Sequence, residues 1–165
     1  MNTDLLLSAC ELLRDVTPLK SDCGQLCGAA CCRDNGEAGS GVWLLPGESS
    51  EKMKWGEIIP CVMPETKTTA RMLVCRGKCV REARPFMCRI FPLSPFYSKK
   101  NAKWSVRMDR RAAALCPLFA YGKKGLSPEF VQKAKQAVSL LASDDGYRTL
   151  LETLEREEAA FRIEL

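Results

Sequence analysis

The chain has 165 residues, of which 46% are apolar and 27% are charged, a composition that excludes a disordered protein. This length fits a single domain over residues 1–165. The formal net charge of +5 could simply offset a cluster of cysteine thiolates, so it is weak evidence for a nucleic-acid partner. There are ten cysteines and no histidine, which excludes Cys/His zinc patterns and histidine-based catalysis.

The N-terminal residues predict a helix over 3–16 that Thr3 caps. One face of it is apolar: Leu5, Leu6, Ala9, Leu12, Leu13 and Val16. Cys10 lies on or near this face and is predicted to be a core cysteine. The segment lacks the basic region of a signal peptide, and no run approaches the roughly 18 apolar residues of a membrane span. We therefore expect a cytoplasmic protein without a membrane partner, in which thiols stay reduced.

The middle of the chain predicts short strands. A strand over 41–45 closes on a Pro46–Gly47 turn, and others cover 57–62, interrupted by Pro60, 71–75 and 103–108. Cys61, in the second of these, has no partner at ligand spacing, and a core role is favoured for it. Residues 85–97 contain three prolines and are expected to form an ordered loop around the core.

The tail predicts two helices within 127–163. Ser127 is a capping residue and Pro128 suits the first helical position, while Asp144 or Asp145 begins the second helix. Tyr147, Leu150, Leu151, Leu154 and Phe161 would face inward. The predicted fold is small α+β: an irregular, cysteine-rich, metal-centred core over about 23–116, with an N-terminal helix and two C-terminal helices around it.

The sequence CGQLCGAACC places four cysteines within ten residues, at 23, 27, 31 and 32. Its small spacers let the backbone turn tightly, so several sulfurs can approach one point. Cys23, Cys27 and Cys31 share a helical spacing, whereas Cys32 is expected to point elsewhere. The adjacent pair therefore suggests two neighbouring sites or a polynuclear cluster.

A second set of cysteines completes a group of eight. Cys75 and Cys79 repeat the four-residue step, and Cys88 and Cys116 follow. Clustered thiolates in a cytoplasmic chain are typical of metal ligands, and thiolate-only ligation suits both zinc and iron–sulfur clusters. The predicted ligands are Cys23, Cys27, Cys31, Cys32, Cys75, Cys79, Cys88 and Cys116.

Other interpretations of these residues stay open. The cysteines could form disulfides, fill the core separately or act as redox thiols, since Arg84 and Arg89 flank Cys88 and would lower its pKa. The same arginines could instead hydrogen-bond the sulfurs of a bound cluster, which is the role favoured here. Glu48 could be an oxygen ligand, an arginine partner or an ordinary turn residue.

Two motifs carry a resemblance to a known family. CGQLCGAACC, followed by VWLLPGE and CRGKCVREARPFMCRIFPL, resembles the YkgJ-type cysteine-cluster proteins, which are described as zinc- or iron-chelating. The similarity covers about residues 23–95, with three-residue spacers where the family has a two-residue spacer before its Cys-Cys pair. The resemblance implies metal binding. The family also includes flagellin lysine methylase, whose cysteine cluster is linked to iron–sulfur chemistry.

The sequence thus predicts a metal-binding protein for zinc or iron, with no catalytic residue identified. One alternative is an iron–sulfur enzyme resembling a methyltransferase or oxidoreductase. Another is a nucleic-acid-binding zinc module, whose contacts would be the basic pairs Lys99–Lys100, Arg110–Arg111 and Lys123–Lys124. These pairs are scattered through the predicted loops, where basic residues are usually solvated, so nucleic acid is the weaker alternative.

Overall fold

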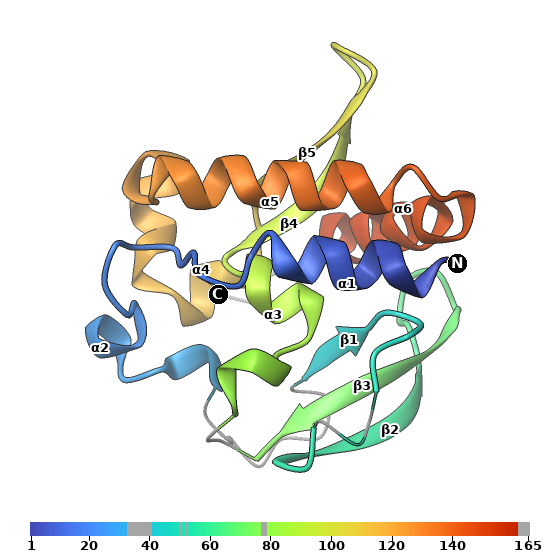
Figure 1. Ribbon diagram of the computed structural model, residues 1–165, viewed down its shortest axis with the longest axis horizontal. Helices are drawn as coiled ribbons and strands as arrows, with labels where there is room; N and C mark the ends of the chain where they lie inside the picture. The colour runs from blue at the N-terminus through green and yellow to red at the C-terminus, as the bar shows by residue number, and fades with distance from the viewer. Residues whose placement is uncertain (33–40, 50, 52, 77–78, 162–165) are drawn as a thin grey trace.

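The computed structural model describes residues 1–165 except 33–40, 50, 52, 77–78 and 162–165. It has the α+β fold that the sequence predicts, with helices packed against two antiparallel sheets (Figure 1). Within the described ranges, no helix has both the length and the apolar character needed to cross a membrane.

The first sheet has the strand order β1–β3–β2, with β1 at Val42–Leu44, β2 at Gly56–Val62 and β3 at Thr69–Cys75. The predicted interruption of the second strand is wrong, because β2 runs continuously through Pro60, which pairs with Arg71. Since β2 is an edge strand, a proline there need not remove a ladder hydrogen bond.

The second sheet is a hairpin of β4, Leu93–Ser98, and β5, Lys103–Met108. The predicted loop over 85–97 is wrong, because this stretch contains helix α3, Phe86–Ile90, followed by β4. Pro85 precedes the helix, where a missing N–H costs nothing, and Pro95 lies in a two-stranded sheet in which both strands are edges. The prolines therefore separate short regular elements.

Three longer helices form the layer opposite the first sheet (Figure 1): α1, Thr3–Glu11; α5, Pro128–Leu141; and α6, Asp145–Ala160. α1 ends five residues earlier than predicted, and its cap is Asn2, whose Oδ1 accepts the Asp4 N–H at 2.9 Å. α5 begins at Pro128 as predicted, but the Ser127 side chain makes no capping hydrogen bond. The inward face of α6 is partly as predicted, since Tyr147, Leu151 and Leu154 are buried whereas Phe161 is 38% exposed.

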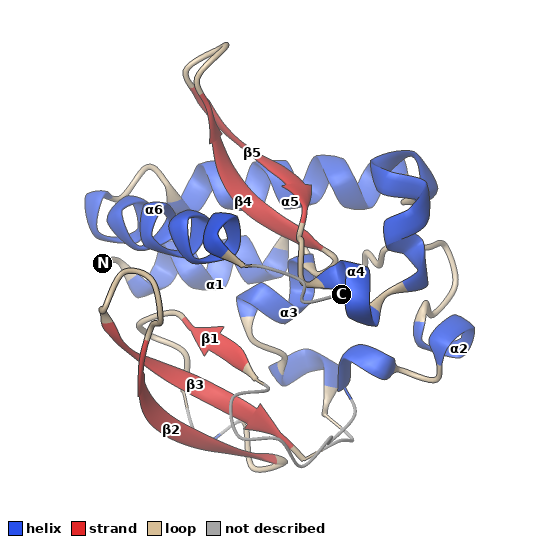
Figure 2. Cartoon of the chain, turned by 180° about the vertical axis from the view of Figure 1, so that it is seen from behind, coloured by secondary structure: helices blue, strands red, loops and turns tan. Residues whose placement is uncertain are grey.

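The main core lies between this helical layer, α3 and the hairpin (Figure 2). Its fully enclosed side chains come from α1, α3, β5, α5 and α6, and include Ala9, Phe86, Ile90, Val106, Phe130 and Leu141. Removing a buried aromatic ring such as that of Phe130 costs about 3–5 kcal/mol.

Five short elements lie to one side of the long helices, at the lower left of Figure 1. They are α2, Gly24–Cys27; the 3₁₀ helices η1, Ala30–Cys32, and η3, Arg81–Ala83; α4, Ala112–Leu115; and the 3₁₀ segment η4, Pro117–Gly125. Together with the end of β3 and α3, these elements contain or flank all eight predicted ligands.

Candidate thiolate site

The first cysteine segment is a single helical turn that stops abruptly. Cys23 is the N-cap of α2 and Cys27 its last residue. Gly28, at φ 58°, and Ala29, at φ 55°, then adopt left-handed conformations, and the Ala29 N–H donates to the Gly24 carbonyl at 2.9 Å. This pattern ends a helix by satisfying its last carbonyls. Cys31 therefore does not continue the helical face that its spacing predicts.

The next turn brings Cys31 and Cys32 together. Both belong to η1, and their Sγ atoms lie 3.9 Å apart. Cys32 is expected to point elsewhere than Cys23 and Cys27, and its neighbours are Cys31 and Cys79 of the second segment. Cys31 is exposed, and a hydrogen bond from Cys32 lowers the pKa of its thiol, whereas the pKa of Cys32 is raised to about 11.

The second cysteine segment contacts the first through Cys79. Its thiol shares a hydrogen bond with that of Cys32, and Arg84 Nε donates to Cys79 Sγ at 3.1 Å. The hydrogen bond with Cys32 is the largest cause of the raised Cys79 pKa, followed by burial. Three thiols and one guanidinium therefore form a continuous row from Cys31 to Arg84.

Cys88 lies in α3, beside this row. Burial raises the pKa of its thiol well above the usual range, and the nearby charges of Cys75, Cys32 and Cys79 raise it further. The predicted lowering of the Cys88 pKa is therefore wrong, because burial outweighs the attraction between Arg84 and the Cys88 thiolate. Arg84 directs its Nε at Cys79.

Within the described part of the chain, Arg89 donates no hydrogen bond to a sulfur as Arg84 does. Its Nε donates to the Arg84 carbonyl at 2.8 Å, and its Nη2 donates to the Glu82 carbonyl at 2.6 Å. Both acceptors belong to the η3–α3 connection. Of the two predicted sulfur-binding arginines, Arg84 thus contacts a thiol and Arg89 braces the backbone.

Cys116 joins the opposite end of the group. It follows α4, where its N–H donates to the Ala112 carbonyl at 2.8 Å. Burial raises the pKa of Cys23, with further contributions from Asp22, Cys27 and Cys116. The charges of Cys23, Cys27 and Cys88 in turn act to raise the pKa of Cys31. All eight predicted ligands are therefore electrostatic neighbours in one region.

These neighbours do not converge at ligand distance. Among the residues that the structure describes, no three His, Cys, Asp or Glu side chains are arranged to hold a metal ion. Cys23, Cys31, Cys32 and Cys79 are free thiols and not disulfides. The fold thus gathers the thiols, and ligation would require their side chains to rotate.

The two remaining cysteines lie outside this group. Cys10 packs against the main core, as predicted, and burial raises its pKa to about 11. Cys61, on the edge strand β2, belongs to neither described hydrophobic cluster, so the core role expected for it is wrong.

Glu48 has a role that its position in a turn did not reveal. The residue is only 8% exposed, and its carboxylate accepts the backbone N–H groups of Leu45, at 2.7 Å, and Phe86, at 2.6 Å. Burial raises its pKa, although these two hydrogen bonds and the charges of Arg71 and Arg89 oppose the rise. Only a contact between distant segments distinguishes this glutamate from an ordinary turn residue.

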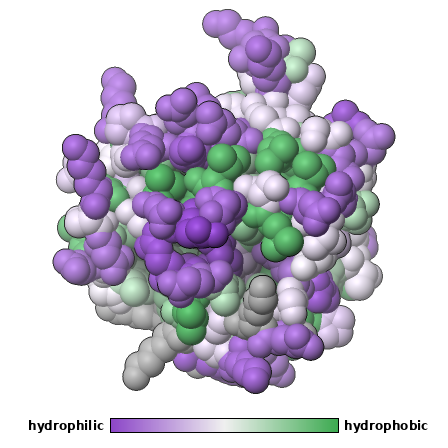
Figure 3. Space-filling model, in the orientation of Figure 1, coloured by the Kyte–Doolittle hydropathy of each residue, from purple (hydrophilic) through white to green (hydrophobic). Residues whose placement is uncertain are grey.

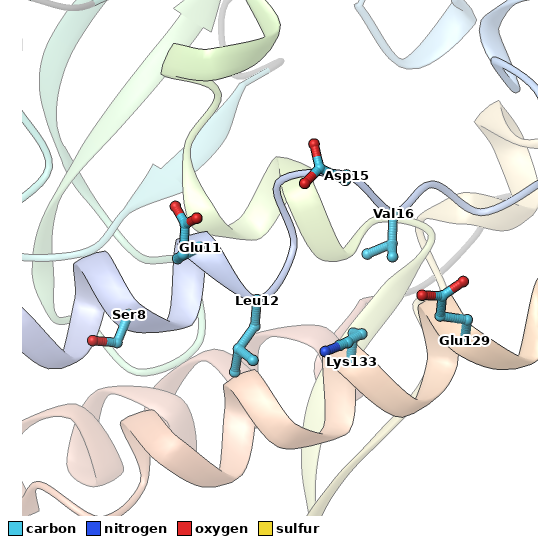
Figure 4. Close-up of a pocket in the computed structure, with 7 residues that line it drawn as sticks. All are labelled: Ser8, Glu11, Leu12, Asp15, Val16, Glu129 and Lys133. Atoms are coloured by element: carbon cyan, nitrogen blue, oxygen red, sulfur yellow. The ribbon is translucent and has the colours of Figure 1, made fainter.

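A surface depression of about 400 Å³ lies elsewhere, between α1 and α5 (Figure 4). It is lined by Ser8, Glu11, Leu12, Asp15, Val16, Glu129 and Lys133, and no cysteine borders it. Figure 3 shows apolar side chains on the face over these two helices, interrupted by hydrophilic ones. The depression is therefore separate from the thiols.

The predicted basic pairs are partly occupied by contacts within the protein. Arg111 forms two hydrogen bonds to the buried carboxylate of Asp109, and Arg110 Nη1 donates to the Ala159 carbonyl at 2.9 Å. Lys123 Nζ donates to the Val106 carbonyl at 3.2 Å. These contacts give the side chains structural roles and weaken the case for a nucleic-acid interface.

No family model, no curated protein and no solved structure matches the chain.

Proposed function

We propose that this protein binds zinc or iron through clustered cysteine thiolates, in the manner of the YkgJ-type proteins that its motifs resemble. The observation that carries the proposal is the row of Cys31, Cys32, Cys79 and Arg84, which joins two segments far apart in the sequence. The ligands are the eight predicted cysteines. The reducing cytoplasm is the proposed compartment, because it keeps thiols available to metal ions.

The donor set fits such ions. Thiolates without imidazole suit zinc and iron–sulfur clusters, and the chain contains no histidine. A zinc ion with Zn–S bonds of about 2.3 Å in a tetrahedron requires its sulfurs to lie roughly 3.8 Å apart. The separation of 3.9 Å between Cys31 Sγ and Cys32 Sγ is close to that value, so sulfurs in this region approach one another about as closely as zinc ligands do.

The raised thiol pKa values are consistent with a site that needs a cation. Burial and neighbouring thiols disfavour the thiolates of Cys32, Cys79 and Cys88 in the absence of metal. A bound ion would reverse that balance, since coordination deprotonates a thiol outright. Arg84 would then stabilise the negative charge on Cys79 sulfur by donating a charge-assisted hydrogen bond.

The pKa influences among the eight cysteines suggest how these ligands divide between two sites. The charges of Cys27 and Cys116 raise the pKa of Cys23, and that of Cys27 raises the pKa of Cys116. The charges of Cys75, Cys32 and Cys79 raise the pKa of Cys88. Cys31 contacts Cys32, and the charges of Cys23 and Cys27 act to raise its pKa. We assign Cys31 to the first group, which gives two adjacent four-thiolate sites.

The test is purification without oxygen, followed by metal analysis and absorption spectroscopy. Zinc in a colourless protein would support two structural sites. Iron and inorganic sulfide with visible absorption would support an iron–sulfur cluster and favour the alternative of an iron–sulfur enzyme. A folded protein that takes up neither metal, with its cysteines reduced, would overturn the proposal.

A further inference from the structure

A turn stabilised by its own side chain lies between β1 and β2. Pro46 and Gly47 form its centre, and the φ of 95° at Gly47 is one that glycine adopts without a steric penalty. The Glu48 N–H donates to the Leu45 carbonyl at 3.2 Å, and Glu48 Oε2 accepts the Leu45 N–H at 2.7 Å. The carboxylate is thereby folded back over the turn and away from solvent.

The second carboxylate oxygen reaches helix α3. Oε1 of Glu48 accepts the N–H of Phe86, the first residue of the helix, at 2.6 Å. Pro85 occupies the N-cap position and has no side chain that can accept this hydrogen bond, and Phe86 is fully buried. An unpaired N–H at such a place would be costly. Glu48 therefore supplies the cap that the local sequence lacks.

The turn itself is fixed from two directions. Arg71 Nη2, on β3, donates to the Glu48 carbonyl at 3.1 Å, and Tyr147 Oη, on α6, donates to the Pro46 carbonyl at 2.8 Å. The position of the carboxylate is thus set by the first sheet and the helical layer together. Through its hydrogen bond to Phe86, the carboxylate in turn fixes the start of α3.

We propose that Glu48 is the positioning residue for Cys88, holding α3 so that this thiol faces Cys75, Cys32 and Cys79. Cys88 follows Phe86 by two residues within the same five-residue helix, so a shift of its first turn moves the sulfur. The carboxylate is close enough for its charge to influence the thiol. This inference rests on the proposed metal-binding function for its consequence, and on the hydrogen bonds for its geometry.

The variant Glu48→Gln tests the proposal. A glutamine oxygen can accept one of the two N–H groups, but its amide nitrogen cannot accept the other. The matched control is Glu158→Gln, because Glu158 is also buried and accepts a backbone N–H, that of Arg110, at 2.9 Å. Both variants lose a buried carboxylate, and only the first changes a side chain that hydrogen-bonds α3.

Three measurements separate positioning from general destabilisation, all made where both variants are folded. Zinc affinity by chelator competition should fall about 10- to 100-fold in Glu48→Gln and stay near the wild-type value in Glu158→Gln. Alkylation of Cys88 and hydrogen exchange of the Phe86 amide, both in metal-free protein, should accelerate only in Glu48→Gln. Wild-type values for all three in Glu48→Gln would overturn the proposal.

The remaining outcomes are also decisive. If the wild-type protein binds no zinc, the proposed function loses its zinc form, while Cys88 alkylation and Phe86 exchange still decide the role of Glu48. If Glu48→Gln does not fold, exchange in the wild-type protein decides. A protected Phe86 amide then supports the proposal, and exchange at the rate of an unstructured chain overturns it.

Discussion

The thiol of Cys32 hydrogen-bonds the thiol of Cys79, and this contact joins the two cysteine segments of the chain. Cys32 belongs to η1, whereas Cys79 precedes η3, and the long β1–β3 region separates them in sequence. In the proposed division each four-thiolate site takes ligands from both cysteine sets: Cys116 joins Cys23, Cys27 and Cys31, and Cys32 joins Cys75, Cys79 and Cys88. Metal binding as proposed therefore depends on tertiary structure.

Loss of either thiol should have the same effect on metal content. We expect Cys32→Ser and Cys79→Ser each to lower bound metal by about one ion, and the double variant to lose no more than one single variant, because both remove ligands of one site. Metal analysis of the three proteins tests this. Additive losses in the double variant would show that the two cysteines serve different ions.

Cys88 and Cys10 should behave differently, although burial raises the pKa of both. Cys88→Ser should reduce metal content and stability together. Cys10→Ser should retain the wild-type metal content and lose only about 1–3 kcal/mol, the cost of burying a hydroxyl in the core. Metal analysis with thermal unfolding checks both expectations. Metal loss in Cys10→Ser would show that the core cysteine is a ligand.

Substitutions of Arg84 and Arg89 should also have different effects. Arg84→Gln removes the donor to Cys79 Sγ and should weaken zinc binding, by about 10-fold or more, with little change in fold. Arg89→Gln removes two hydrogen bonds to backbone carbonyls and should lower thermal stability more than zinc affinity. Equal effects on affinity would mean that both arginines act on the sulfurs.

Cys31 should be the most reactive of the clustered thiols in metal-free protein. It is exposed, and the hydrogen bond from Cys32 lowers its pKa, so more of it is thiolate at neutral pH. Cys32→Ala removes that hydrogen bond and should slow alkylation of Cys31, as followed by mass spectrometry. Cys88, whose pKa is raised, should react slowly in the same sample and serves as the internal reference.

Asp144 should make stability depend on pH. Hydrogen bonds from the backbone, that of Tyr147 foremost, hold its pKa below the usual value. A lowered carboxyl pKa stabilises the fold above the unfolded-state pKa, and that stability is lost as the pH falls through the folded-state pKa. Asp144→Asn should therefore unfold at a lower temperature than wild type at neutral pH, and the gap should close below about pH 4.

Asparagine keeps the capping oxygen, so the variant isolates the charge. Asp144→Ala removes the cap as well and should unfold at a lower temperature than Asp144→Asn throughout the same pH range. A gap between wild type and Asp144→Asn that stays constant with pH would contradict the assignment.

Local signals predict the regular elements well where neighbouring residues determine them. Pro128 and Asp144 correctly indicate where α5 and α6 begin, and the alternation over 103–108 coincides with β5. The prolines of 85–97 mislead because their cost depends on strand position, which the sequence does not reveal. Likewise, α1 ends at Glu11 with Leu12 as its C-cap, although Leu12, Leu13 and Val16 all pack in or against the core.

The candidate site could be predicted in composition but not in arrangement. The eight thiols predicted as ligands lie as electrostatic neighbours, and Cys10 packs against the main core as predicted. The role of the eight thiols as metal ligands stays a prediction. Cysteine spacing does not predict the left-handed residues Gly28 and Ala29, which redirect Cys31 and Cys32, nor the long-range capping by Glu48. Both features depend on contacts or dihedral angles that no short motif encodes.

Two of the predicted ligands stand at the ends of regular elements, since Cys75 is the last residue of β3 and Cys116 is the C-cap of α4. Ligands at the ends of separately anchored elements would make a bound ion a cross-link among the sheet, α3 and the segment after α4. An ion that binds the folded state and not the unfolded chain stabilises the fold by mass action. Metal binding would then slow the separation of the sheet, α3 and the segment after α4. Metal removal would loosen the contacts among these elements.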